Sequence, residues 1–216
     1  MGFDLYGISP KMNTPKPAAI TDFLGEDGWA DYKKLSKNDT VDEDGNKVRS
    51  EEHEAYWKAD AKWEDENPGR YFRNSVWWWR PLWDFVCEVA DDILTKEDKE
   101  NGHSNSGHII DEEKSLIIVK ILENLLKSGE VKRYEEIYDG HMDSLPLEDC
   151  EYCEGTGTRT WEDGDKDCNV CNTSFTKDEG VPVGKKKQFQ TSYPFDVKNV
   201  ERFVRFCKQS GGFKIS

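Results

Sequence analysis

The chain has 216 residues, only 35% of them hydrophobic, and a formal net charge of −14. No apolar run approaches the roughly 20 residues of a membrane span, which argues against a membrane protein. So acidic a surface repels phosphate, which argues against a protein that binds nucleic acid over most of its surface. Eight Trp, 8 Tyr and 10 Phe are nevertheless too many for a disordered chain, so we expect a folded core with extensive solvated loops.

The first 50 residues predict one short strand and one hairpin. Apolar and polar residues alternate over residues 3–6, and Gly7 closes the run, which is typical of a strand. Residues 11–50 are polar and rich in turn formers, and within them Asp44-Gly45 predicts a hairpin. The N-terminus has neither the basic nor the hydrophobic region of a secretory signal, so we expect the protein to act in the cytoplasm.

The remaining regular structure is predicted mostly as amphipathic helices, because apolar residues recur at intervals of three and four. Capping residues, a first-turn proline and terminal glycines mark their ends. The predicted ranges are approximately 51–67, 81–94, 112–128, 131–138 and 196–209. A closing strand at 213–215 follows the last helix.

Four of the six cysteines form two closely spaced pairs, Cys150-x-x-Cys153 and Cys168-x-x-Cys171. Each pair can form a knuckle, a tight turn that presents two thiolates to one metal ion, and two knuckles complete a tetrahedral zinc site. The segment between the pairs is polar and cannot form a hydrophobic core, so we expect one zinc ion to take the place of that core. The alternatives are two disulfides or four reduced thiols, and disulfides are disfavoured in a protein without a secretory signal. Four thiolates leave no open position for a substrate, so the expected zinc is structural.

These elements predict an α+β protein, mainly helical, with a small terminal sheet and an inserted zinc-knuckle module. Residues 1–147 are expected to form a helical body with an N-terminal strand and an acidic insertion at about 15–60. Residues 148–176 are expected to form the zinc module, and 190–216 a helix and strand that return to the body.

The first cysteine pair resembles a known zinc-binding repeat. Residues 150–157 (CEYCEGTG) match the CxxCxGxG repeat in the cysteine-rich region of the J-domain co-chaperones, where glycines let the chain turn closely around the sulfurs. The second pair lacks these glycines, and the J-domain signature His-Pro-Asp is absent. The resemblance covers about 25 residues and implies half of such a module, without chaperone activity.

A broader resemblance covers most of the chain. Its start MGFDLYG, the blocks YFRN, WWWRPLW and GHSN, the cysteine pairs and the block SYPF are similar to those of a family of small uncharacterised bacteriophage proteins. This chain departs from that family by an insertion at roughly 15–60. The resemblance implies a source and an architecture, and no activity.

Three consecutive tryptophans within residues 71–83 are the most unusual feature. In an extended segment Trp78 would point away from both neighbours, so we expect at least one indole at the surface. Aromatic rings beside arginines are typical of protein anchors and of stacking pockets for nucleotides. The alternative is a corner of the core in which Trp77 and Trp79 pack and the arginines pair with Asp84 or Asp91. The candidate binding surface comprises Arg73, Asn74, Trp77, Trp78, Trp79, Arg80, His103 and Asn105.

The charge is unevenly distributed. Residues 185–216 contain eight basic and two acidic side chains, a net charge of +6, which leaves −20 for residues 1–184. The basic tail is expected to pack against the acidic body, and a local contact with nucleic acid is the alternative. A lone His103 in a polar loop is usually not catalytic, and no catalytic set emerges from the sequence.

The leading functional hypothesis is a bacteriophage accessory protein that binds a host or phage protein in the infected cell. Two alternatives remain: an enzyme or sequestering protein for a nucleotide-like molecule that uses the Trp, Arg and His residues, and a zinc module that binds nucleic acid through the basic tail. A closed pocket containing Trp78, Arg80 and His103 would favour the small molecule, whereas an exposed aromatic patch would favour the protein partner.

Overall fold

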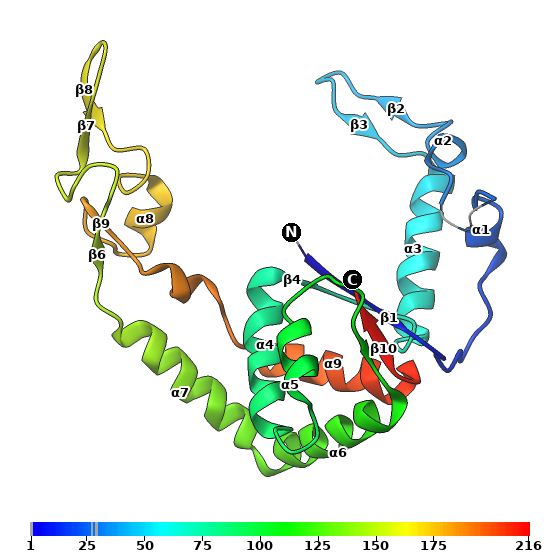
Figure 1. Cartoon of the computed structure of the whole chain (residues 1–216). Coiled ribbons are helices and arrows are strands. Elements are labelled where there is room, and N and C mark those ends of the chain that lie inside the picture. Colours follow the sequence, from blue (N-terminus) through cyan, green and yellow to red (C-terminus); the bar gives the residue numbers. More distant parts are fainter. Residues whose placement is uncertain (1, 27, 29) are drawn as a thin grey trace.

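The computed structural model describes residues 2–26, 28 and 30–216. It consists of a central body from which two arms project, one formed early in the chain and one between the body helices (Figure 1). Both ends of the described chain belong to the body, because Asp4 and Ser216 exchange backbone hydrogen bonds of 2.9 and 2.8 Å.

The body is built on an antiparallel sheet that brings the two ends of the chain together. Its strand order is β4-β1-β10-β5, with β1 at Gly2–Gly7, β4 at Tyr71–Ser75, β5 at Ile109–Ile110 and β10 at Phe213–Ile215. Leu5 lies between Phe72 of β4 and Ile215 of β10, and all three side chains are buried. The predicted strands at both termini are therefore confirmed, and they are direct neighbours.

Two helices, α4 (Val76–Val89) and α9 (Val197–Ser210), pack against the strands of this sheet. Helix α6 (Glu112–Ser128) packs on α9, and α5 (Lys96–Asn101) contacts α4, where Trp83 donates to the carbonyl of Lys99. Phe203 and Phe206 of α9 each lie 5.6 Å from the ring of Phe72 on the sheet. Gly129 ends α6 as predicted, since its φ of 81° is the left-handed conformation that a C-terminal glycine supplies.

The position of α4 differs from the prediction. The helix begins at Val76, so Pro81 is its sixth residue and does not lie in its first turn. Trp77, Trp78 and Trp79 are therefore helical, and the expectation of an extended segment there is wrong. Proline removes the hydrogen bond that the carbonyl of Trp77, four residues earlier, would accept, and Trp77 is partly exposed.

The first arm has a small hydrophobic core of its own. It contains α1 (Ala18–Thr21), α2 (Tyr32–Leu35), the hairpin of β2 (Thr40–Val41) and β3 (Lys47–Val48), and α3 (Glu51–Glu66). Its buried cluster consists of Ile20, Leu35, Tyr56 and Trp63. The hairpin predicted around Asp44-Gly45 is present, and Ser50 caps α3 by accepting a hydrogen bond from the backbone N–H of His53.

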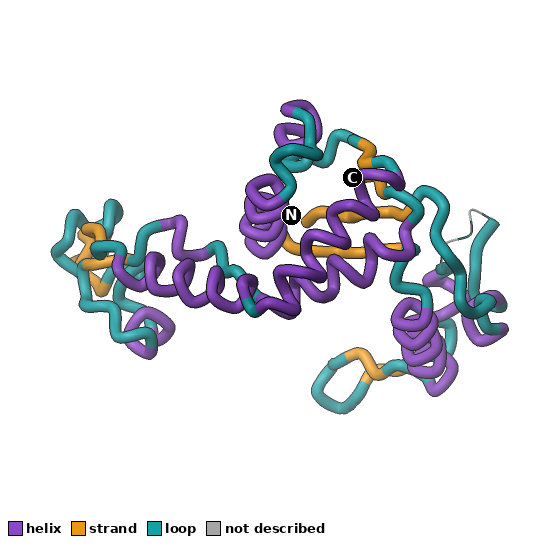
Figure 2. The backbone as a smooth tube through the Cα atoms, turned by 90° about the horizontal axis from the view of Figure 1, so that it is seen from below, coloured by secondary structure: helices purple, strands orange, loops and turns teal. Residues whose placement is uncertain are grey.

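The second arm consists of one helix and the module at its end. Helix α7 (Glu130–Ser144) leads from the body to the module, as Figure 2 shows from below. The module contains β6 (Glu148–Asp149), β7 (Thr158–Trp161), β8 (Gly164–Asp167), α8 (Ser174–Asp178) and β9 (Lys185–Lys186). The chain then returns to the body through the 3-10 helix η1 (Phe189–Ser192). We call residues 148–186 the cysteine module.

The predicted fold class is confirmed. Helices make up most of the regular structure, and the strands form small antiparallel sheets. Within the described residues, no helix combines the length and the apolar character needed to cross a membrane.

Candidate metal centre and binding surface

Four buried cysteine sulfurs converge in the cysteine module. The Sγ atoms of Cys150, Cys153, Cys168 and Cys171 all lie within 4.8 Å of one another. Cys150 and Cys168 are 3.9 Å apart, and Cys153 and Cys171 are 3.5 Å apart. A tetrahedral metal with sulfur at about 2.3 Å needs sulfur–sulfur distances of about 3.8 Å, whereas a disulfide needs about 2.05 Å. The four predicted ligands are thus arranged to hold a metal ion.

A glycine supports each knuckle. After the first pair, Gly157 adopts a φ of 78°, and its backbone N–H donates to the sulfur of Cys153 at 3.2 Å. The second pair lacks such a glycine, and Gly184 approaches the cysteines from a distant part of the chain: its carbonyl accepts the backbone N–H of Cys150 at 2.8 Å, and its own N–H favours the thiolate of Cys171. A Cβ at Gly184 would lie 2.1 Å from the carbonyl oxygen of Gly155, so no larger residue fits. Sequence reasoning missed Gly184, because a lone glycine is not a specific signal.

The rest of the cysteine module is more ordered than its polar composition suggested. The segment between the knuckles folds into the β7–β8 hairpin. Strand β9 lies beyond residue 176, where the sequence placed the end of the module, and yet it pairs with β6. Lys185 contacts Asp149 at 2.6 Å, and Lys186 contacts Glu151 at 3.1 Å.

The buried cluster of the cysteine module consists of the four cysteines, among the side chains that the structure describes. Backbone amides favour a thiolate within it. Burial opposes ionisation of Cys168, but the backbone N–H groups of Cys171 and Val170 lower its pKa to about 7. Burial dominates at Cys171 and raises its pKa to about 12. Metal ligation requires thiolates, so one ligand is close to the required form at neutral pH.

The other two cysteines belong to the helices of the body. Burial raises the pKa of Cys87 to about 12, and it raises the pKa of the fully buried Cys207 as well. Thiols of this kind pack as small apolar groups and are poor nucleophiles at neutral pH.

The side chains of the three tryptophans leave α4 in different directions because they are consecutive on a helix, so each has different neighbours. Trp79 is fully buried, and its ring stacks on Trp83 at 5.4 Å and on Phe3 at 5.5 Å. Its Nε1–H donates to the carbonyl of Gly102 at 2.7 Å. Trp77 and Trp78 are each 37% exposed, so the expectation of at least one surface indole is met by both.

Trp77 forms an exposed aromatic cluster with two residues that follow the cysteine module. Its ring centroid lies 5.4 Å from that of Phe189 and 4.9 Å from that of Tyr193. Arg80, one turn along α4, donates to the hydroxyl of Tyr193 at 3.3 Å. Phe189 remains 68% exposed. We call Trp77, Phe189 and Tyr193 the aromatic cluster; its second and third members were missed as site residues, because Phe189 stands in a polar stretch.

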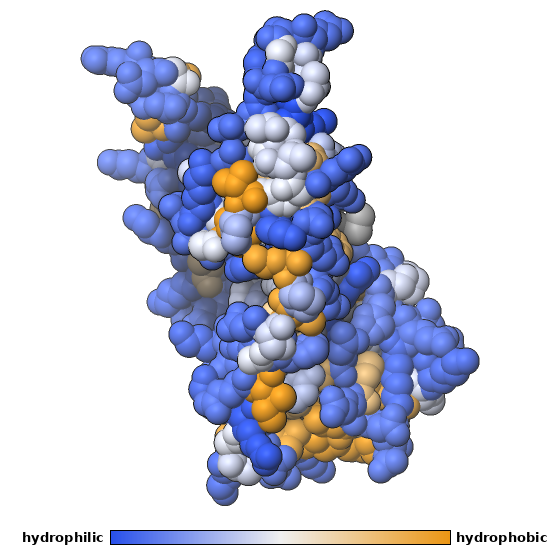
Figure 3. All heavy atoms as spheres, turned by 90° about the vertical axis from the view of Figure 1, so that its left-hand side faces the viewer, coloured by the Kyte–Doolittle hydropathy of each residue, from blue (hydrophilic) through white to orange (hydrophobic). Residues whose placement is uncertain are grey.

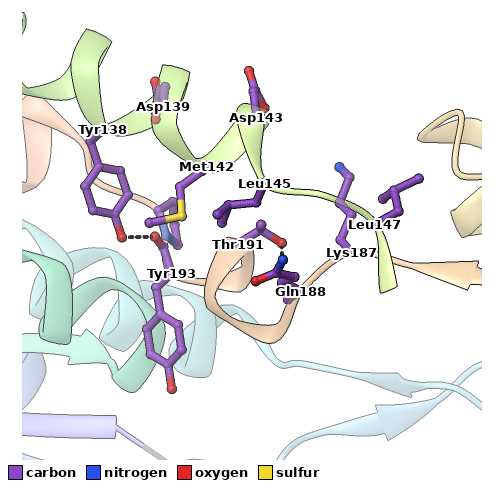
Figure 4. Close-up of a pocket in the computed structure, with 11 residues that line it drawn as sticks. Tyr138, Asp139, Met142, Asp143, Leu145, Leu147, Lys187, Gln188, Thr191 and Tyr193 are labelled. Atoms are coloured by element: carbon purple, nitrogen blue, oxygen red, sulfur yellow. Dashed lines mark hydrogen bonds between the residues drawn. The ribbon is translucent and has the colours of Figure 1, made fainter. Parts of the chain in front are cut away.

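A groove lies next to the aromatic cluster, between α7 and the returning chain (Figure 4). It has a volume of about 390 Å³ and is bounded by Tyr138, Met142 and Leu145 on one side and Gln188 and Thr191 on the other. The hydroxyl of Tyr138 donates to the carbonyl of Tyr193 at 2.6 Å, which ties α7 to the cluster.

Acidic side chains line one wall of this groove. Asp139 and Asp143 stand one turn apart on α7. Burial, together with the negative charges of Glu135 and Asp143, raises the pKa of Asp139. A positive charge placed there would relieve this repulsion.

The remaining predicted site residues lie apart from the aromatic cluster, so the eight do not form one surface. Trp78 and Asn74 line a separate hollow beside α9. Arg73 faces Asp4 with 3.7 Å between Nε and Oδ1, and His103 contacts Asp84 at 3.2 Å. Asn105 donates to the carbonyl of Gly2 at 2.9 Å. Trp78 lines the hollow beside α9, whereas Arg80 lines a different one together with Asp84 and Tyr193.

The basic tail packs largely against acidic partners, as expected. Besides the two pairs within the cysteine module, Lys187 contacts Glu179 at 3.2 Å. On α9, Arg205 contacts Asp65 at 2.6 Å and Lys208 contacts Glu123 at 2.7 Å. Five of the eight basic residues of the tail are thus paired with acids, and Lys198, Arg202 and Lys214 form no ion pair with the described residues.

Comparison of the chain with protein-family models, with curated protein sequences and with solved structures gives no match.

Proposed function

We propose that this protein binds another protein through the aromatic cluster and the groove beside it, and that a structural zinc holds the cysteine module at the end of α7. The observation that carries the proposal is the exposure of Phe189, a phenylalanine packed against Trp77 yet 68% accessible to solvent. Aromatic side chains with an adjacent arginine are the residues that contribute most binding energy at protein interfaces.

The surroundings of the aromatic cluster support a protein partner over a small molecule. Leu147, an exposed apolar side chain, also lines the groove, and Ile137 on α7 and Val183 in the cysteine module are exposed as well. Figure 3, which views this side of the molecule, shows hydrophobic residues as separate patches among hydrophilic ones. A surface of this mixed kind is typical of interfaces that form and dissociate.

The charge of the groove indicates the chemistry of the partner. Asp139 and Asp143 lie on the groove wall, and the carboxylate of Asp84 lies beside Arg80 and Tyr193. We infer that the partner presents lysine or arginine residues around an apolar anchor, because such a segment neutralises these carboxylates as it covers Phe189.

Zinc is the metal that the ligand set favours. Four cysteine thiolates in two knuckles are the ligands of structural zinc sites, and four sulfurs leave no position for a substrate. We propose that the metal replaces a hydrophobic core in the cysteine module and thereby fixes the chain that carries Phe189.

The biological setting is proposed from the sequence resemblance alone. The similarity to a family of bacteriophage proteins supports an accessory protein of a phage, acting on a host or phage protein in the cytoplasm of the infected cell.

The test is affinity capture from infected host cells with the tagged protein and two matched variants. Phe189→Ala removes the exposed ring of the aromatic cluster, and Tyr32→Ala removes an aromatic ring of similar exposure, 61%, on the other arm. Proteins captured by the wild type and by Tyr32→Ala, and reduced about tenfold or more with Phe189→Ala, support the proposal. Equal capture by all three proteins contradicts it.

A charge reversal tests the partner's chemistry separately. Asp139→Lys should weaken the same capture, whereas Glu43→Lys in the exposed hairpin of the first arm should leave it unchanged. If the partner still binds Asp139→Lys but does not bind Phe189→Ala, the inference of a basic partner is contradicted, and the proposed binding surface is still supported.

A further inference from the structure

A second hollow, distinct from the groove, lies where the N-terminal ends of α4 and α9 meet strand β4. It has a volume of about 300 Å³ and is lined by Asn74, Trp78, Asp196, Lys198, Asn199 and Arg202. Trp77 and Trp78 leave α4 in different directions, so this hollow and the aromatic cluster use different neighbouring residues. The size is at the lower end of the range for small-molecule sites.

Two cations of this hollow have no ion-pair partner among the described residues, and its acidic lining residue, Asp196, accepts the backbone N–H of Lys198. Arg205 and Lys208, farther along α9, each have an acidic partner within 2.7 Å. Arg202 and Lys198 form no ion pair with any residue that the structure describes. The guanidinium of Arg202 is held in place by packing over the ring of Phe72, 5.3 Å from its centroid. In a chain of net charge −14, two adjacent unpaired cations favour an anionic ligand.

The backbone amides of the helix end are already used, so side chains must bind the anion. The N–H of Val197 donates to Glu135 at 3.0 Å, and that of Lys198 donates to the carboxylate of Asp196 at 2.8 Å. The site therefore differs from a phosphate site at a bare helix N-terminus. Its cations are the guanidinium of Arg202 and the ammonium of Lys198.

Aromatic and amide groups stand next to these cations in a fixed arrangement. The amide of Asn74 donates to the Oδ1 of Asn199 at 2.9 Å, and Asn199 donates to the carbonyl of Trp78 at 3.2 Å. Asn74 and Asn199 are both nearly buried. Asn74 lines the hollow, and its Oδ1 accepts no hydrogen bond from the described residues, so this oxygen is free to accept one from a ligand.

We propose that this hollow binds a nucleoside phosphate. The base stacks on the exposed indole of Trp78, the phosphate is held by Arg202 and Lys198, and the Oδ1 of Asn74 accepts from a donor on the base. Stacking on an aromatic ring tolerates any base, and the arginine fork matches phosphate oxygens. The same chemistry is offered by a free nucleotide and by the 5′-phosphorylated end of a single strand.

The test measures binding of ATP, GTP, CTP and UTP to the full-length protein by isothermal titration, with adenosine as the ligand that lacks phosphate. Arg202→Ala should weaken nucleotide binding about tenfold or more, and Trp78→Ala should do so as well. Arg205→Ala, which removes a paired arginine from the same face of α9, is the matched control and should bind as the wild type does. Thermal melting verifies the fold of each variant, and Arg202→Ala decides the result if Trp78→Ala does not fold.

Absence of binding for all four nucleotides up to about 1 mM overturns the proposal. So does equal affinity for adenosine and ATP, or an equal effect of Arg202→Ala and Arg205→Ala. In a second experiment, a 5′-phosphorylated oligonucleotide is added as a competitor of the bound nucleotide. Competition that is lost with Arg202→Ala identifies a strand end as a ligand of the site, and no competition identifies the free nucleotide.

Discussion

The ring of Phe189 packs edge-on against Trp77, with 5.4 Å between the centroids and an angle of 70° between the planes. This contact joins the first turn of α4 to the segment that leaves the cysteine module. It positions an exposed aromatic side chain beside a groove with an acidic wall, and the proposed protein-binding surface depends on it.

The tryptophans of α4 should contribute very differently to stability. Trp79→Ala should lower the free energy of unfolding by about 3–5 kcal/mol, because a fully buried indole and its hydrogen bond to Gly102 are lost. Trp77→Ala should cost about 1 kcal/mol or less, because its ring is partly exposed. Urea unfolding of the two variants measures the difference, and equal losses would show that Trp77 is a core residue.

Removal of metal should unfold the cysteine module and leave the body folded. The four cysteines form the buried cluster of the module, whereas the body has its own large hydrophobic core. Amide hydrogen exchange with and without a chelator should show lost protection at 148–186 and retained protection in α6 and α9. Cys153→Ser should give the chelated pattern without a chelator. Unchanged protection of the module in both experiments would mean that it folds without metal.

A buried carboxylate should make stability fall at acid pH. Burial alone opposes the ionisation of Asp98, but hydrogen bonds from Lys114, His108 and Thr95 hold its pKa well below the ordinary value. A depressed pKa adds stability above about pH 4, and this stability is lost as the pH falls toward the folded-state value. Asp98→Asn should destabilise the protein by about 3 kcal/mol at neutral pH, since it leaves Lys114 without its partner.

The measurement is urea unfolding of Asp98→Asn and of the wild type between about pH 7 and about pH 3. The difference in free energy should shrink as the pH falls. Asp44→Asn, at the exposed tip of the hairpin in the first arm, is the control and should show a small difference at every pH. A constant difference for Asp98→Asn would assign its effect to packing.

Double-stranded DNA should bind weakly, with a dissociation constant above about 1 μM at physiological salt. Most basic residues of the tail are paired with acids of the same chain, as Arg205 is with Asp65 and Lys208 with Glu123. Fluorescence anisotropy with a labelled duplex tests this expectation. Tighter binding would show that these ion pairs open to release a nucleic-acid surface.

Local patterns in the sequence predicted those parts of the molecule that depend on neighbouring residues. The spacing of the cysteines predicted their convergence, and alternation predicted β1, because both patterns express the geometry of a single turn or strand. The start of α4 was not predictable in this way. Its first turn is a continuous run of tryptophans with no helical periodicity, and Pro81 suggested a later start.

The surfaces depend on contacts between distant segments, which no local pattern encodes. Phe189 meets Trp77 because the chain returns from the cysteine module along α7, and Gly184 reaches Cys171 because β9 pairs with β6. Arg202 stays free of acids while Arg205 meets Asp65, although both are exposed on one helix. Only the tertiary fold distinguishes these two arginines.

The most direct test of the central claim is photo-crosslinking from the position of Phe189. A photoreactive phenylalanine analogue at residue 189 should crosslink to a protein in infected cells, because this side chain would lie inside the interface. The same analogue at Tyr32, an aromatic of similar exposure on the other arm, is the matched control. We expect a crosslinked protein that is specific to position 189 and is lost in an Asp139→Lys background. The same crosslinked species from both positions, or none from position 189, would contradict the central claim.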